Sequence, residues 1–130
     1  MAELRLNALK NYLSLLEKRN VEIVRVGGLQ KPKRTKLVGK LKGFGYGTPF
    51  LIEYRVGRKV KSGVLETMRP GGFGHDFPWD RAQSLLFAHC TYNRLPLHVR
   101  SVDVGILTKK NELRSVGDFS EFFLLTEKVQ

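Results

Sequence analysis

The chain has 130 residues, of which 42% are hydrophobic and 27% charged, and a formal net charge of +11. This length suits one domain with a real core, and the composition excludes a disordered tail. No apolar run reaches the roughly 18 residues of a membrane span, and no secretory signal opens the chain. A single cysteine, Cys90, excludes an internal disulfide. We therefore expect a cytoplasmic protein that does not contact a membrane.

The first half of the chain predicts one helix followed by strands. Leucines that recur every three or four residues predict a helix over residues 3–19. After it, apolar and polar side chains alternate, which is typical of half-buried strands, and glycines or a proline-containing connector separate the runs. Strands are expected at residues 21–26, 37–42, 49–56 and 59–68.

The second half predicts another helix and the rest of the sheet. A helix is expected from Trp79 to about Leu95, with Asp76 as its N-cap. Cys90 lies on its apolar side, where a buried and inert thiol is expected. Further strands are expected at residues 97–107, 113–116 and 121–126. The last of them is apolar on both faces, as in a fully buried strand.

These elements predict an α+β fold. A mostly antiparallel sheet of five to six strands would pack against a helix. Residues 1–20 would form an N-terminal helix, and residues 21–130 would form a single lobe.

The centre of the predicted sheet holds a glycine-rich loop, Gly43-Phe44-Gly45-Tyr46-Gly47. Glycine lets backbone N–H groups approach a ligand without a Cβ in the way, and phosphate is the usual ligand of such loops. Basic residues surround the loop and outnumber acids by ten to one between residues 31 and 61. They are Lys31, Lys33, Arg34, Lys36, Lys40, Lys42, Arg55, Arg58, Lys59 and Lys61. A plain hairpin turn on a solvated surface is the alternative interpretation.

Several short runs within this order of elements resemble one protein family. The order resembles the N-terminal lobe of the protein-kinase-like fold, and the runs resemble the aminoglycoside phosphotransferase family. The runs are Leu65-Glu66-Thr67-Met68-Arg69-Pro70-Gly71-Gly72-Phe73-Gly74-His75, Asp80-Arg81-Ala82, Tyr92-Asn93-Arg94-Leu95-Pro96 and Asp103-Val104-Gly105. The resemblance covers roughly residues 21–130.

The resemblance implies ATP as the ligand. The loop from Gly43 to Gly47 would fold over the ATP phosphates. The C=O of Glu127 and the N–H of Val129 would bind the adenine edge. The apolar surroundings of the adenine would include Thr126 and Val64. The implied nucleotide-binding residues are therefore Gly43, Phe44, Gly45, Tyr46, Gly47, Val64, Thr126, Glu127 and Val129.

The chain departs from the family at the catalytic residues. Glu66 stands where the family has its phosphate-binding lysine, and an anion there would repel phosphate. The catalytic loop and the magnesium ligands of the family's second lobe have no counterpart in this sequence. We therefore expect neither a catalytic residue nor a metal site here. The chain would bind nucleotide, would hold no Mg²⁺ alone, and would act as a phosphotransferase only with a C-terminal lobe.

Two other functions remain open. The basic region interleaves with the aromatic residues Phe44, Tyr46, Phe50 and Tyr54. Exposed aromatics among lysines are typical of nucleic-acid-binding modules, although Phe50 and Tyr54 share the strand face that is expected to be buried. The apolar run from Phe122 to Leu125 predicts a surface that a C-terminal lobe or a partner chain would cover, as in a non-catalytic interaction subunit.

Overall fold

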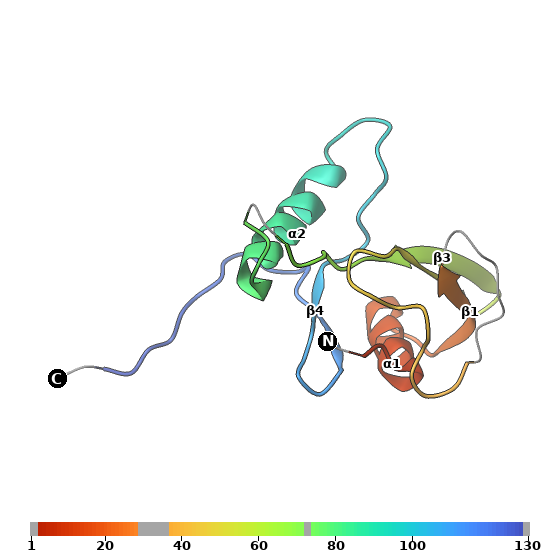
Figure 1. Cartoon of the computed structure of the whole chain (residues 1–130). Helices are drawn as coiled ribbons and strands as arrows, with labels where there is room; N and C mark the ends of the chain where they lie inside the picture. Colours follow the sequence, from red (N-terminus) through yellow and green to blue (C-terminus); the bar gives the residue numbers. More distant parts are fainter. Residues whose placement is uncertain (1–2, 29–36, 72–73, 129–130) are drawn as a thin grey trace.

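The computed structural model describes residues 3–28, 37–71 and 74–128, and these ranges hold two helices and five strands (Figure 1). The helices are α1 (Leu6–Glu17) and α2 (Pro78–Tyr92). The strands are β1 (Val21–Gly28), β2 (Phe50–Val56), β3 (Lys59–Leu65), β4 (Gly105–Leu107) and β5 (Leu113–Ser115). The expected α+β class and antiparallel pairing are confirmed.

The main sheet contains β1, β2 and β3 in that order, so β1 and β3 are its edges. Its central strand buries every second side chain, as the alternation in the sequence predicts. Gly57 joins β2 to β3 with φ +59°, a backbone conformation that glycine adopts without the strain a Cβ would cause. β4 and β5 form a separate hairpin.

The expected sheet of five to six strands is corrected to a three-stranded sheet and a two-stranded hairpin in the described residues. Within residues 37–42, only Lys40 pairs, in an isolated bridge to Arg5. Within residues 97–107, only the last three form a strand. Alternation makes a segment suitable for a sheet, but a strand forms only where a second backbone lies in register beside it.

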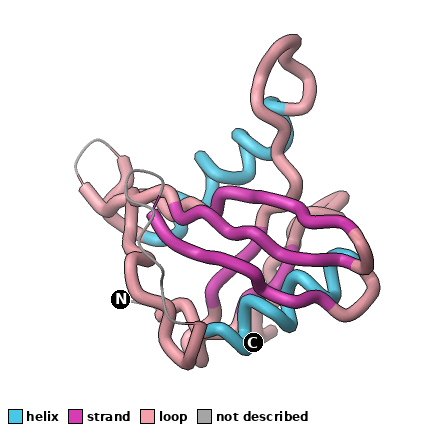
Figure 2. Tube along the Cα trace, turned by 90° about the vertical axis from the view of Figure 1, so that its right-hand side faces the viewer, coloured by secondary structure: helices cyan, strands magenta, loops and turns pink. Residues whose placement is uncertain are grey.

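The core lies between α1 and the main sheet, with α1 against one side of the strands (Figure 2). Within the described ranges, the buried side chains all come from the first 56 residues. They are Leu4, Leu9, Leu13, Val21, Ile23, Val26, Leu41, Phe50, Ile52, Tyr54 and Val56. At about 25 cal/mol per Å² of buried apolar area, this cluster is the main source of the chain's stability.

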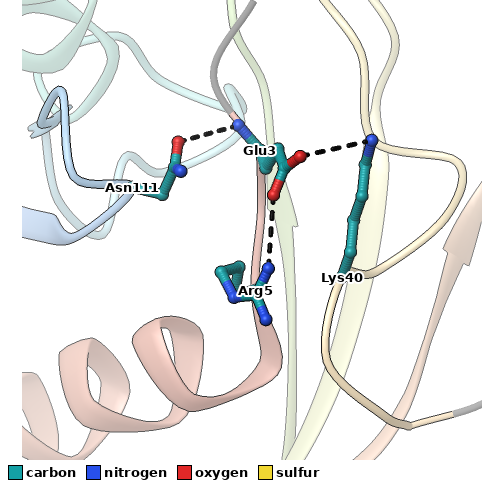
Figure 3. Close-up of polar contacts among 4 residues, drawn as sticks. All are labelled: Glu3, Arg5, Lys40 and Asn111. Atoms are coloured by element: carbon teal, nitrogen blue, oxygen red, sulfur yellow. Dashed lines mark hydrogen bonds and ion pairs between the residues drawn. The ribbon is translucent and has the colours of Figure 1, made fainter.

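The segment before α1 connects three parts of the chain (Figure 3). The Glu3 carboxylate forms ion pairs with Arg5 and Lys40 at 3.3 and 3.7 Å, and the Glu3 N–H donates to the Asn111 side chain at 3.0 Å. Backbone bonds reinforce the contact, because the Leu41 N–H donates to the Leu4 C=O at 2.8 Å. The N-terminal segment thereby holds both the chain before the glycine loop and the β4–β5 turn.

The second half of the chain contributes little to the core. Among its described residues no side chain is fully buried, and Leu113 only packs against the core cluster. α2 has no buried residue, so the expected burial of Cys90 is wrong, and the thiol is exposed. The N-cap of α2 is Phe77 rather than the expected Asp76, and it forms no side-chain capping bond. The expected buried strand at residues 121–126 is also wrong. Residues 121–128 are exposed, have no regular structure and extend away from the body of the molecule (Figure 1).

Candidate functional site

The glycine loop is a fixed turn that lies against the chain leaving β3. The Gly47 N–H donates to the Thr67 C=O at 2.7 Å, and the Thr67 hydroxyl donates to the Gly45 C=O at 3.4 Å. Gly43 and Gly47 have φ values of +92° and +71°, in the region that favours glycine. These bonds and conformations place the loop at the Leu65 end of the sheet.

The side chain of Phe44 anchors the loop to the core. Its ring meets the buried ring of Phe50 edge to face, with the centroids 6.0 Å apart and an interplanar angle of 87°. Such an aromatic pair contributes about 0.5–1.5 kcal/mol beyond its buried area. Phe44 is therefore a packing residue, and its ring is not free to stack on a base.

Two arginines from outside the predicted basic region lie beside the loop. A Cβ placed on Gly47 would come within 3.0 Å of the Arg69 Cβ and 3.4 Å of its Nε. Arg81, on α2, has its guanidinium carbon 5.8 Å from the centroid of the Tyr46 ring, a distance typical of cation–π contacts. The loop therefore lies within reach of two guanidinium groups.

Arg81 is held in place by the turn before α2. Its Nη1 donates to the C=O of His75 at 2.9 Å and to the C=O of Asp76 at 3.2 Å. These bonds occupy one nitrogen of the guanidinium and leave other N–H groups for a ligand. Arg69 is exposed and forms no hydrogen bond or ion pair with the residues that the structure describes.

The loop also has backbone donors without a described partner. The amide groups of residues 43–46 donate to no residue within the ranges that the structure covers, whereas those of Gly47 and Thr48 are bonded. Consecutive N–H groups in a tight turn form a concave surface that binds anions. Together with the two arginines, they make this end of the sheet suitable for a phosphate group.

A buried nitrogen lies in the turn before α2 that holds Arg81. Nδ1 of His75 is buried and has no hydrogen-bond partner among the described residues. Buried polar atoms are almost always bonded to protein, water or ligand, so this nitrogen is a further group that a ligand could satisfy. The residue with the orphaned nitrogen is also the one whose carbonyl holds Arg81.

The structure brings some of the predicted nucleotide-binding residues together. Val64, half exposed on β3, lies next to Leu65, which pairs with Phe50 at the loop end of the sheet. Thr126 and Glu127 lie in the exposed segment that extends away from the body (Figure 1), and Val129 is outside the described residues. The loop and the predicted adenine-binding residues are therefore not assembled into one site here.

Much of the positive charge on the sheet is neutralised by acids. Arg25 pairs with Glu53 at 2.8 Å, and Lys61 pairs with Glu17 at 2.8 Å. Arg55 forms a third pair, with Glu22, at 3.1 Å. The predicted cationic surface is accordingly weaker than the count of basic residues indicates. Two of its four aromatic residues, Phe50 and Tyr54, are buried, as their shared strand face predicts, which speaks against a stacking platform for bases.

A second polar cluster connects α1, α2 and the β4–β5 hairpin. The Asp103 carboxylate accepts hydrogen bonds from the hydroxyls of Tyr12 and Ser115. Burial and the hydrogen bond to Asp103 raise the pKa of Tyr12 well above its ordinary value. His89 and Ser101 contact each other nearby, with Nδ1 and Oγ 2.7 Å apart. Tyr12 is neutral at ordinary pH and donates to an anion, which makes this cluster a structural tie.

The sequence reasoning missed Arg69 and Arg81 as candidate site residues. Both are present in the runs that resemble the phosphotransferase family, but nothing local marks them as neighbours of a loop more than twenty residues away. Among the residues that the structure covers, no group of three or more histidines, cysteines or carboxylates could hold a metal ion.

Comparison with known proteins adds no relative. No protein family, curated protein or solved structure matches the chain. None of the helices in the described part of the chain is long and apolar enough to cross a membrane. The residues around the glycine loop are therefore the features of this chain that point to a function.

Proposed function

We propose that this chain binds the phosphates of a nucleotide, with ATP as the expected ligand, at the loop from Gly43 to Gly47. One observation carries the proposal: Arg69 lies against Gly47 and Arg81 lies over the ring of Tyr46, in a loop whose amides at residues 43–46 have no partner among the described residues. Guanidinium groups and backbone N–H groups are the donors that proteins use most for phosphate oxygens.

The order of elements supports a kinase-like nucleotide-side lobe. Three antiparallel strands, a helix and a short hairpin follow one another in this chain, which is the order of the N-terminal lobe that the sequence resembles. A sheet of five to six strands would additionally require residues 97–104 and 121–126 to pair. In such a lobe the C-terminal residues Thr126 and Glu127 would supply the adenine side of the site.

The proposed role is binding without turnover. Glu66, exposed just after β3, is in the place of the family's phosphate-binding lysine and would repel a phosphate. Arg69 and Arg81 would supply positive charge in its place. Phosphate transfer would require a base and magnesium ligands from a second lobe, so we expect a nucleotide-binding lobe of a phosphotransferase that does not catalyse by itself.

Titration of the ¹⁵N-labelled chain with ATP, with and without Mg²⁺, tests this proposal. We expect amide shifts at residues 43–47, because these groups would donate to the phosphates. Shifts at Thr126 and Glu127 would add the adenine side. Unchanged loop signals at millimolar nucleotide would contradict the proposal.

Three arginine variants assign the phosphate contacts. Arg69→Gln and Arg81→Gln should each weaken ATP binding by about tenfold or more, because a hydrogen bond to a charged group contributes about 1.5–3 kcal/mol. Arg58→Gln removes the same charge at the opposite end of the β2–β3 hairpin and should change affinity much less. Equal weakening by all three variants would indicate a diffuse electrostatic effect and not a site at the loop.

A further inference from the structure

We propose that residues 121–127 of one copy of this chain add as a strand to the β3 edge of a second copy. This contact does not use the phosphate site at the glycine loop, but it includes Thr126 and Glu127, the residues proposed above for the adenine side. It rests on a donor segment, a free acceptor edge and the charges that the two carry.

The donor segment has the composition of a buried strand but is exposed. Phe123, Leu124 and Leu125 are 91%, 87% and 86% exposed. The segment has no glycine or proline and is apolar at four consecutive positions, a composition that favours strand pairing. Covering this surface is favourable by about 25 cal/mol per Å² of apolar area.

The acceptor is the outer edge of β3. This strand pairs only with β2 in the described residues, so its other side presents unpaired backbone donors and acceptors. Val60 and Val64 are about half exposed along it, at 56% and 50%. β3 has seven residues, the length of the donor segment 121–127. Addition of an extended segment to such an edge is a common mode of recognition.

Charge selects between the possible partners of this edge. Arg58 lies in the turn before β3 and Lys59 is the first residue of the strand, with no acid among residues 57–65. Lys61, on the same strand, is already paired with Glu17 and adds little to this charge. Two β3 edges would therefore repel each other, which is how edge lysines prevent unwanted pairing. The segment from Asp118 to Lys128 carries three acids and one lysine, so its charge is opposite to that of the edge.

The position of the donor segment favours pairing with the β3 edge of a second copy over pairing with β3 of the same molecule. Residues 121–128 extend away from the body that carries β3 (Figure 1), so their backbone is available to another molecule. If each copy donates to the other, the two contacts are equivalent and the assembly closes as a symmetric dimer. A closed dimer would cover both apolar segments at once.

Light scattering of the full chain over a range of concentrations tests this inference. We expect the mass to rise from that of one copy to that of two as concentration increases. Added salt should weaken the dimer, because the segment and the edge attract each other electrostatically. Amide exchange at β3 should slow in the dimer, because the added strand bonds its free edge.

Two variants at the exposed residue Leu124 distinguish backbone strand pairing from a purely hydrophobic contact. Leu124→Pro keeps an apolar side chain but removes an N–H and cannot continue a strand ladder, so it should abolish the dimer. Leu124→Ala keeps the N–H and should weaken the dimer less. Leu124 is exposed and makes no regular structure, so neither variant should alter the fold.

Three outcomes would overturn the inference. The chain could be monomeric at every concentration with β3 amides that exchange freely. The Leu124→Pro variant could dimerise as well as the wild type, which would place the contact elsewhere. It could protect its β3 amides as a monomer, which would show that the segment pairs with its own sheet.

Discussion

Glu17 connects α1 to the sheet through two different partners. Its carboxylate accepts from the Lys61 ammonium at 2.8 Å and from the Tyr54 hydroxyl at 2.9 Å. The bond from Lys61 lowers the pKa of Glu17; burial opposes this effect, and the Tyr54 bond adds to it. Burial of the ring and its hydrogen bond to Glu17 raise the pKa of Tyr54 to about 12. One carboxylate thus ties a helix to two strands.

A Glu17→Gln variant should lose part of its stability and of its acid sensitivity. Because the folded-state pKa of Glu17 lies below its unfolded value of 4.5, the contribution is present above pH 4.5 and is lost as pH falls through the folded pKa. We expect the variant to be about 1 kcal/mol less stable than the wild type at pH 7. Its free energy of unfolding should also fall less than that of the wild type when the pH is lowered. Urea unfolding at several pH values measures both effects.

Glu22→Gln is the matched control for this carboxylate. Glu22 forms an ion pair with Arg55 but is largely exposed, so the change should be within about 0.5 kcal/mol. Similar losses in the two variants would mean that the position of Glu17 between Lys61 and Tyr54 adds nothing.

Tyr12→Phe tests the cluster around Asp103. The variant removes a hydrogen bond to an ionised acceptor and should cost about 1.5–3 kcal/mol in urea unfolding at pH 7. Because the folded-state pKa of Tyr12 is raised, its contribution is present below about pH 10 and is lost as pH rises through the folded value. Ser115→Ala, which removes an exposed bond to the same carboxylate, should cost less. Equal free energies of unfolding for wild type and Tyr12→Phe at pH 7 would contradict the stabilising role of this hydrogen bond. A difference that stays the same up to the most alkaline pH would contradict the raised pKa.

At the scale of elements, the glycine loop depends on its backbone conformation. Gly47→Ala should destabilise the chain by about 1–2 kcal/mol, because φ is +71° and the new Cβ would come within 3.0 Å of Arg69. Gly45→Ala should change stability by less than about 0.5 kcal/mol, since no atom lies within 4 Å of its Cβ. Thermal unfolding followed by circular dichroism compares the two variants. A larger effect at Gly45 would show that the loop has a different conformation.

Local sequence signals predicted the elements whose partners are close in the chain. The helix at residues 3–19 forms as α1, and the tight turn after Val56 joins β2 to β3. Each needs only contacts within a few residues or across one turn. The strands expected at 37–42 and 97–107 needed distant partners. The described residues provide only an isolated bridge between Arg5 and Lys40 for the first, and a three-residue pairing of β4 with β5 for the second.

At the scale of the whole molecule, the chain has one core and a large part outside it. In the described residues, every buried hydrophobic side chain precedes Gly57, and α2 buries none. α2 contacts the rest of the molecule through side chains such as Arg81, whose guanidinium lies over the Tyr46 ring, and His89, which contacts Ser101. Stability should therefore be unevenly distributed along the chain.

Hydrogen exchange should reveal this division. Amides of α2 should exchange at least about tenfold faster than those of β2, because local opening of α2 exposes little apolar surface. Mass spectrometry after labelling compares the peptides that cover the two elements. Equal protection in α2 and β2 would indicate a single cooperative unit that includes both.

The sequence by itself determined the α+β class, α1, the β2–β3 hairpin and the glycine loop, because each follows from spacing and turn residues within a short window. Only the tertiary structure decided which alternating segments became strands, which aromatic residues became core, and which arginines lie beside the loop. The physical reason is that burial and pairing depend on what folds alongside a segment. The run from Phe122 to Leu125 is the clearest case, because its composition suits a buried strand and no described part of the chain covers it.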